Sequence, residues 1–443
     1  MASGSSKPDT DHAVGGVAAG SLGPVQPQER VLLLDVLRGA AVLGILLANN
    51  NAAAYLSFLL PSALDRLLAN LVEVLVRDKF WPLFALLFGI GCAVQLERAN
   101  ARSAPIVLLY LRRLLFLAMI GGALQLVIDV PQLQHLAIAG VPMLVIGYVL
   151  RRRSRQMLLG FALALAALCL SVAIPRDLAR AGAVAGQPAG TAEPAADRIA
   201  QFRARSEPSE ARALAWKLDR IGPHARQALR SYRDLPLDVV RARGLHLYLL
   251  LHMLVGMFLW RTGVLQEPGR RRHLFLWLFA VSLPIGIGAG IFVNSVQVAG
   301  TQAARFGLGT YPTRLSALLL SPARLVAELA MPLAYIAGIV LLMERAVWAR
   351  VVNVLASVGR MAFTNYAIQA LWPALVFGYY VPTIVPLGSL SGLERITVLV
   401  GLFGLQVVIS RAWLRSHRFG PLEWLWRSLA YWRFQPMRGV AEG

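Results

Sequence analysis

The stretch Leu34–Asn50, LDVLRGAAVLGILLANN, decides the fold, because it is an apolar run with charges at one end only. Asp35 and Arg38 stand three residues apart, so on a helix they share a face and can pair. The stretch ends on two amides, Asn49 and Asn50. Two interpretations are open: a charged helix end in the headgroup layer, or a polar site that opens into a membrane.

The composition places the whole chain in a membrane. Of its 443 residues 57% are hydrophobic and only 15% are charged, and the mean hydropathy is +0.58. A soluble protein of this length is far more polar. The net charge of +21 does not indicate a nucleic-acid partner, because the arginines flank apolar runs. Cations in such positions set the orientation of spans and meet anionic lipid, so the lipid bilayer is the expected partner.

Apolar runs predict about ten transmembrane helices, each of which needs about 20 mostly apolar residues. The predicted spans are residues 36–58, 80–96, 106–128, 135–150, 156–174, 244–263, 273–296, 325–343, 361–381 and 394–413. Residues 348–360, WARVVNVLASVGR, are predicted to form a short interfacial helix. The predicted fold class is therefore all-α, a polytopic helical membrane protein.

The chain divides into five parts on this basis. Residues 1–29 are rich in Gly, Ser, Pro and Ala, which predicts a disordered N-terminus without a signal peptide. Residues 30–174 and 244–414 carry the first and second five spans. Residues 175–243 have no spanning run but a helix-like rhythm, which predicts an extramembrane loop with amphipathic helices. Residues 415–443 form an aromatic and basic tail.

The short loops predict the orientation. With ten spans, one side of the membrane receives the arginine clusters, among them Arg151–Arg155 and Arg270–Arg272. The positive-inside rule makes that side the cytoplasm, and it places both termini there. The loop at 175–243 then lies outside, because loops longer than about 60 residues translocate largely regardless of their charge.

No soluble-enzyme motif is present: the chain has no GxGxxG after a strand, no Walker loop, no HExxH and no GxSxG. Its two cysteines, Cys92 and Cys169, lie inside apolar spans, so neither a disulfide framework nor a metal cluster is expected. His246 and His252 are six residues apart and face different sides of a helix, which excludes a metal pair. The sequence therefore predicts no metal site and no bound cofactor.

A late motif, GRMAFTNYAIQALWP at 359–373, carries amides into an apolar span. Asn365 and Gln369 are four residues apart and share a helix face. They could form interhelical hydrogen bonds, which contribute about 0.6 kcal/mol on average. Alternatively, they could join the polar residues of the first span in one pocket.

Five motifs together resemble one family of bacterial membrane proteins, the YeiB-like family, catalogued as domain of unknown function 418. They are LDVLRGAAVLGILLANN, KFWPLFALLFGIG, RRLLFLAMIGG, VGRMAFTNYAIQ and GPLEWLWRSLAYWRFQPMR, in family order between residues 30 and 438. The resemblance implies a location in the bacterial inner membrane. The family is distantly similar to transmembrane acyltransferases, which open with an LDxxRG-type helix. Those enzymes move acyl groups from cytosolic acyl-CoA to an acceptor across the membrane.

The resemblance makes Asp35 and Arg38 catalytic candidates, because they fall on the shared opening motif. Acyltransferase-3 proteins carry a histidine at the far end of this helix, where the present chain has Asn49, and asparagine cannot act as a general base. YeiB-like proteins commonly have a histidine after the RRLL helix, near the position of Gln125 in this chain. His135 or Asp129 could supply the base instead.

Three functions follow as hypotheses. In a membrane acyltransferase, Arg38, Lys79 or Arg113 would bind the phosphates of acyl-CoA, the donor substrate. The acceptor, an envelope molecule, would be oriented by Asn49, Asn50, Asn365 and Gln369. A transporter or a lipid-binding or small-molecule-binding protein would keep the pocket without chemistry, although no internal repeat typical of transporters is evident. A structural or regulatory scaffold is the third. The oligomeric state stays open.

Overall fold

A computed structural model of the protein describes residues 31–50, 62–101, 106–127, 132–185, 197, 200, 243–303, 313–375 and 391–438. In these ranges the ordered elements are helices and no strand is present, which confirms the predicted all-α fold. Nine helices of the described part are long and apolar enough to cross a membrane, or ten if one bent pair counts as a span. The chain is therefore a multi-pass membrane protein.

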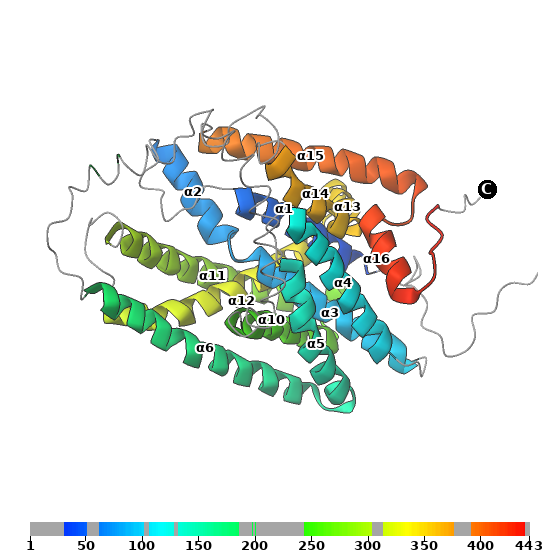
Figure 1. Ribbon diagram of the computed structural model, residues 1–443, viewed down its shortest axis with the longest axis horizontal. Coiled ribbons are helices and arrows are strands. Elements are labelled where there is room, and N and C mark those ends of the chain that lie inside the picture. Colours follow the sequence, from blue (N-terminus) through cyan, green and yellow to red (C-terminus); the bar gives the residue numbers. More distant parts are fainter. Residues whose placement is uncertain are drawn as a thin grey trace, which may run out of the picture.

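The helices fill one elongated bundle (Figure 1). They are α1 (Leu32–Asn50), α2 (Ala63–Leu75), α3 (Phe80–Ala101), α4 (Val107–Val127), α5 (Gln132–Val149), α6 (Arg155–Ala185), α10 (Arg243–Arg261), α11 (Arg272–Thr301), α12 (Arg314–Met343), α13 (Ala349–Arg360), α14 (Ala362–Leu375), α15 (Gly392–Ser416) and α16 (Pro421–Tyr431). Each predicted span overlaps one of these helices, and α13 matches the short helix predicted at 348–360. Residues 51–58 and 376–381, the ends of the spans predicted at 36–58 and 361–381, lie outside the described residues.

Two elements differ from the sequence-based expectations. The sequence analysis assigned nothing to α2, a helix that begins at its N-cap Ser62 and forms one 39-residue apolar stretch with α3. Helix α6 continues to Ala185, inside the segment predicted as a loop. Residues 186–196 and 201–242, where the amphipathic helices were expected, lie outside the described residues. Helix α13 is bent by 76° against α14.

Arginines gather at one end of the bundle, which is called the arginine-rich end below. Short connections join α5 to α6, α10 to α11 and α12 to α13 at this end, the right-hand end in Figure 1. They contain Arg151–Arg153, Arg270–Arg271 and Arg345. Helix α13 starts there and runs beside α1, so α1 also starts at the arginine-rich end.

Two pairs of parallel helices approach each other closely through glycines. A Cβ atom at Gly39 of α1 would lie 2.0 Å from the carbonyl oxygen of Leu355 in α13. In the second pair, α3 and α10, a Cβ at Gly89 would lie 1.9 Å from the oxygen of Met253. A Cβ at Gly256 would lie 2.0 Å from the carbonyl oxygen of Leu86. Small residues permit such contacts between membrane helices.

The C-terminal helix α16 closes the arginine-rich end. Its Trp426 donates a hydrogen bond to the carbonyl oxygen of Arg113 in α4 at 2.8 Å. Its Glu423 accepts hydrogen bonds from the backbone N–H groups of Phe363 and Thr364 at 2.6 and 3.1 Å, and from the Thr364 hydroxyl at 2.6 Å. Burial raises the pKa of Glu423, and these hydrogen bonds oppose the rise. The carboxylate of α16 thus caps the first turn of α14.

We predict that Gly256→Ala destabilises the protein by at least the 1–3 kcal/mol that is typical of overpacking, because the added methyl group meets the backbone of Leu86. The midpoint of thermal unfolding in detergent measures the effect. Gly160→Ala on α6 is the matched control, since nothing lies within 4 Å of its added Cβ. Equal midpoints for Gly256→Ala and the wild type would contradict the close α3–α10 contact.

Removal of the cap should also destabilise the protein. Glu423→Ala leaves the N–H groups of Phe363 and Thr364 without their acceptor, and we expect a loss of about 1–3 kcal/mol in the free energy of unfolding. Glu267→Ala removes a carboxylate whose side chain is 60% exposed in an ion pair with Arg270, and it should change little. Thermal unfolding distinguishes the two, and a similar loss in both variants would argue against the cap.

Candidate functional site

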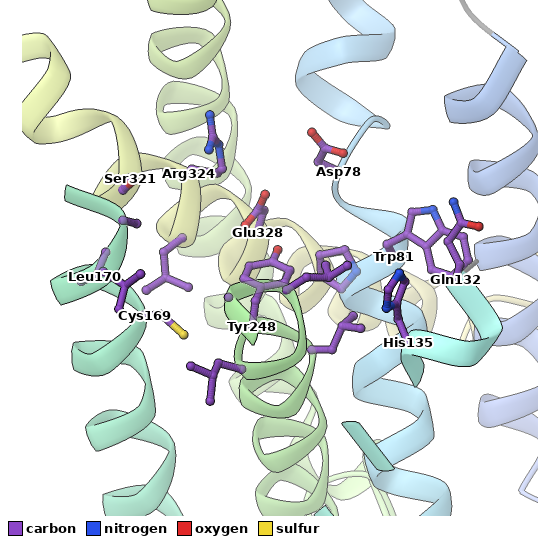
Figure 2. Close-up of a pocket in the computed structure, with 18 of the residues that line it drawn as sticks. Asp78, Trp81, Gln132, His135, Cys169, Leu170, Tyr248, Ser321, Arg324 and Glu328 are labelled. Carbon is purple, nitrogen blue, oxygen red and sulfur yellow. The ribbon is translucent and has the colours of Figure 1, made fainter. Parts of the chain in front are cut away.

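A cavity of about 610 Å³ lies among α3, α5, α6, α10 and α12, at the C-terminal end of α1. Figure 2 shows side chains from these helices pointing toward it. Its polar lining consists of Asn49, Arg77, Asp78, Gln132, His135, Cys169, Arg176, Tyr248, Ser321, Arg324 and Glu328. Its apolar lining includes Leu136, Leu170, Val172, Leu245, Leu247, Leu249 and Leu325. The cavity therefore offers charged groups on an apolar wall.

The cavity lies at different depths along the helices that line it. The first described residues of α5 and α10, which have 18 and 19 residues, line the cavity. In α6 and α12, which have 31 and 30 residues, the lining residues come from the middle of the helix. The cavity lies at the end of α5 and α10 that is opposite to the arginine-rich end.

His135 forms part of the wall, and it is hydrogen-bonded to a second histidine, His246. The Nδ1 atom of His135 lies 2.9 Å from the Nε2 atom of His246, so one ring donates a hydrogen bond to the other. Within the described residues, no hydrogen bond involves the second ring nitrogen of His135. An imidazole with one nitrogen held and the other available is the arrangement that a general base requires. The pair lies on the first turns of α5 and α10, with the His135 ring on the wall (Figure 2).

Two arginines of the lining have no partner in the described part of the chain. Arg176 of α6 and Arg324 of α12 form neither a hydrogen bond nor an ion pair there. Nearby, Ser321 donates a hydrogen bond to Asp177, which ties α12 to α6. Because a guanidinium is always charged and carries five donors, two unpaired guanidinium groups on one wall suit an anionic ligand.

Acidic and hydroxyl groups complete the polar wall. Glu328 and Tyr248 are both buried on this wall, and their side chains interact with each other. Two neighbouring polar groups that face the cavity could also hydrogen-bond a ligand. Asp78 lies in the turn between α2 and α3, with a φ of 58° that few residues other than glycine adopt. Backbone outliers of this kind often mark functional sites.

Two of the predicted site residues line this cavity, His135 and Asn49. Arg38 donates a hydrogen bond to Asp35 at 3.1 Å at the arginine-rich start of α1, which confirms the expected pairing. Lys79 is buried and donates to the carbonyl oxygen of Glu73 at 2.9 Å. The structure does not describe the side chain of Asn50.

The other predicted residues lie elsewhere. The guanidinium of Arg113 lies 4.5 Å from the centre of the Trp426 ring. Asn365 donates to Ser410, and Gln369 donates to Gln406, at 3.0 and 2.9 Å. These last contacts are hydrogen bonds between α14 and α15. The residues proposed from the sequence that do not line the cavity are Asp35, Arg38, Lys79, Arg113, Asn365 and Gln369.

Sequence reasoning did not assign a role to several lining residues. His135 and His246 are 111 positions apart, so only the fold brings them together. Arg324 and Glu328 carried a signal that the sequence analysis did not use. They stand four residues apart within an apolar run, and ionisable residues inside a membrane span are commonly functional. No group of three potential ligands arranged for a metal is present among the described residues.

Comparisons with known proteins support the resemblance to this family. Residues 259–433 match the family described as "Protein of unknown function (DUF418)". The uncharacterized protein YxaH of Bacillus subtilis is 28% identical over 434 residues, which cover 94% of this chain and 98% of YxaH. The uncharacterized protein YeiB of Escherichia coli is 26% identical over 423 residues, with 90% and 96% covered. No solved structure matches the chain. The second half of the chain therefore matches DUF418, and nearly the whole chain is similar to YxaH and YeiB, in agreement with the resemblance that its five motifs indicated.

Proposed function

We propose that this protein is a membrane acyltransferase whose reaction takes place in the cavity lined by His135. One observation carries the proposal: His135, which is hydrogen-bonded to His246, lines the same cavity as two arginines that have no partner among the described residues. The histidine that acyltransferase-3 proteins carry at the end of the first helix is replaced here by Asn49, which lines the same cavity. His135, from another helix, would take its place.

The proposed reaction transfers an acyl group from a thioester such as acyl-CoA to a hydroxyl group of an envelope acceptor. His135 removes the proton from the acceptor hydroxyl while the hydroxyl oxygen forms a bond to the carbonyl carbon of the thioester. The bond between this carbon and the sulfur then breaks. The sulfur takes the proton from the imidazole and leaves as a thiol. His246 holds the His135 ring through their 2.9 Å hydrogen bond. A positioned base of this kind typically contributes about 10²–10⁴-fold to a rate.

The remaining lining would bind the substrates. Arg176 and Arg324 would pair with an anionic group, because guanidinium groups form strong charge-assisted hydrogen bonds with phosphate and carboxylate. The leucines of α6 and α10 would accommodate the acyl chain. We place both termini and the arginine-rich end in the cytoplasm of a bacterial inner membrane, following the positive-inside rule.

A second function, ligand binding without catalysis, is favoured by a different observation. Helices α3 and α10 are in backbone contact at Gly89 and Gly256, between the cavity and the arginine-rich end. A donor from the cytoplasm would need these helices to separate, or another route, to reach His135. A protein that only binds a lipid or a small molecule could take up this ligand from the membrane, or from the side opposite to the arginine-rich end. It would need neither a separation of α3 and α10 nor another route from the cytoplasm.

His135→Gln should separate these functions. We expect acyl transfer by the purified protein to fall by about 10²-fold or more, since glutamine cannot take up the proton. Ligand binding should persist, because the amide keeps a similar size and polarity. His273→Gln, at the exposed start of α11, is the matched control. Transfer of labelled acetyl-CoA and longer acyl-CoAs measures the rate. Undiminished transfer in His135→Gln would eliminate His135 as the base, and no transfer by the wild type would favour binding alone.

The two arginines can be tested by binding. In wild type, acyl-CoA should raise the midpoint of thermal unfolding, because a ligand that binds the folded state stabilises it by mass action. Arg176→Gln and Arg324→Gln should each weaken binding by about tenfold, the equivalent of about 1.4 kcal/mol. Arg314→Gln, at the exposed start of α12, should leave binding unchanged. If all three variants lose the same affinity, the anion is not bound in this cavity.

A further inference from the structure

A second cavity, of about 290 Å³, lies at the arginine-rich end. Its charged and polar lining consists of Glu97, Asn100, Arg151, Arg153, Arg155 and Arg261. These residues come from the end of α3, the connection between α5 and α6, and the ends of α6 and α10 that meet it. We propose that this cavity is a binding site for a phosphate group, separate from the site of the proposed transfer and independent of it.

Two of its arginines are fixed by the fold. Arg261 donates hydrogen bonds to the carbonyl oxygens of Leu150 and Gly147, at 3.0 and 3.2 Å, and so caps the end of α5. Arg151 donates to the carbonyl oxygen of Tyr148 at 2.8 Å, and its guanidinium lies 3.7 Å from the centre of the Tyr148 ring. These contacts use only part of the ten N–H donors of the two side chains, so both can still bind an anion.

The other two arginines are available. Arg153 and Arg155 form no hydrogen bond or ion pair within the described part of the chain, and both are exposed. Arg155 is the first residue of α6, a helix of 31 residues, so the N–H groups of the first turn and the positive end of the helix dipole lie at the same place. Of these N–H groups, that of Met157 donates to the carbonyl oxygen of Ser154. Both features favour an anion, and phosphate in particular.

The single carboxylate of the lining does not neutralise this set. Glu97 accepts a hydrogen bond from the indole of Trp260 at 2.8 Å, which holds it on the α3–α10 side. Four guanidinium groups therefore share a small space with one carboxylate, and they repel one another unless an anion is present. A phosphate accepts bidentate hydrogen bonds from guanidinium groups and would offset this repulsion.

The two cavities occupy opposite ends of the same helices. In α3, Pro82 lines the first cavity and Ala93 the second, and eleven residues along a helix correspond to about 17 Å. Between them α3 and α10 are in backbone contact at Gly89 and Gly256. The phosphate site is therefore open to the solvent or the lipid headgroups at the arginine-rich end. Its ligand is either a soluble phosphate compound or the headgroup of an anionic phospholipid.

The experiment uses the full chain in nanodiscs of phosphatidylcholine. In one arm, pyrophosphate is titrated at constant ionic strength against sodium chloride, and the thermal midpoint and the heat of binding are measured. In the other arm, phosphatidylglycerol replaces part of the phosphatidylcholine. We expect a higher midpoint in at least one arm. A rise with pyrophosphate identifies a soluble phosphate ligand, and a rise with phosphatidylglycerol alone identifies a headgroup.

Arg152→Gln provides the matched control, because Arg152 directly precedes Arg153 in the chain and is exposed but does not line the cavity. Arg153→Gln and Arg155→Gln should each weaken binding about tenfold, and Arg152→Gln should not. Equal losses in all three, or no rise in either arm, would overturn the proposal. His135→Gln should bind phosphate as the wild type does. The proposal of a phosphate site and the proposal of acyl transfer are therefore tested separately.

Discussion

The contact between α3 and α10 is the constraint on which both cavities depend. Gly89 and Gly256 let the two backbones touch, and in a membrane this close packing replaces the hydrophobic drive that holds soluble helices together. The contact keeps the helices parallel and in register. Their first turns therefore lie at one cavity and their last turns at the other. A side chain at either glycine would separate the helices and change both cavities together.

The charged groups are distributed in a way that an apolar bundle tolerates. Ionisable side chains are costly inside a membrane unless they face a cavity or a partner. Arg176, Arg324 and Glu328 face a cavity, and Lys79 is satisfied by a carbonyl oxygen. Most other arginines lie at the arginine-rich end, where water and headgroups solvate them. Arg176 and Arg324, which have no partner among the described residues, therefore both face a cavity where a ligand could reach them.

The first helix illustrates how a family motif serves packing. Asp35 and Arg38 pair with each other, and a Cβ at Gly359 of α13 would lie 1.7 Å from the carbonyl oxygen of Asp35. The motif thus lies where α13 crosses α1, next to the bend into α14. Glu423 of α16 then caps α14 from the far end of the chain. Residues from three distant motifs meet at this place, which explains in physical terms why they occur together in the sequence.

The sequence by itself determined the all-α class, the approximate spans and the gathering of arginines at one side, because apolar run length and flanking charge are local properties. It also identified His135 and Asn49 among the candidates. The hydrogen bond between His135 and His246 depends on which helices pack together. So does the presence of Arg176 and Arg324 on the wall of one cavity. Helix α2 was missed because its amphipathic pattern is shorter than a span. Tertiary structure alone decided the cavities, since a cavity is a property of helices side by side.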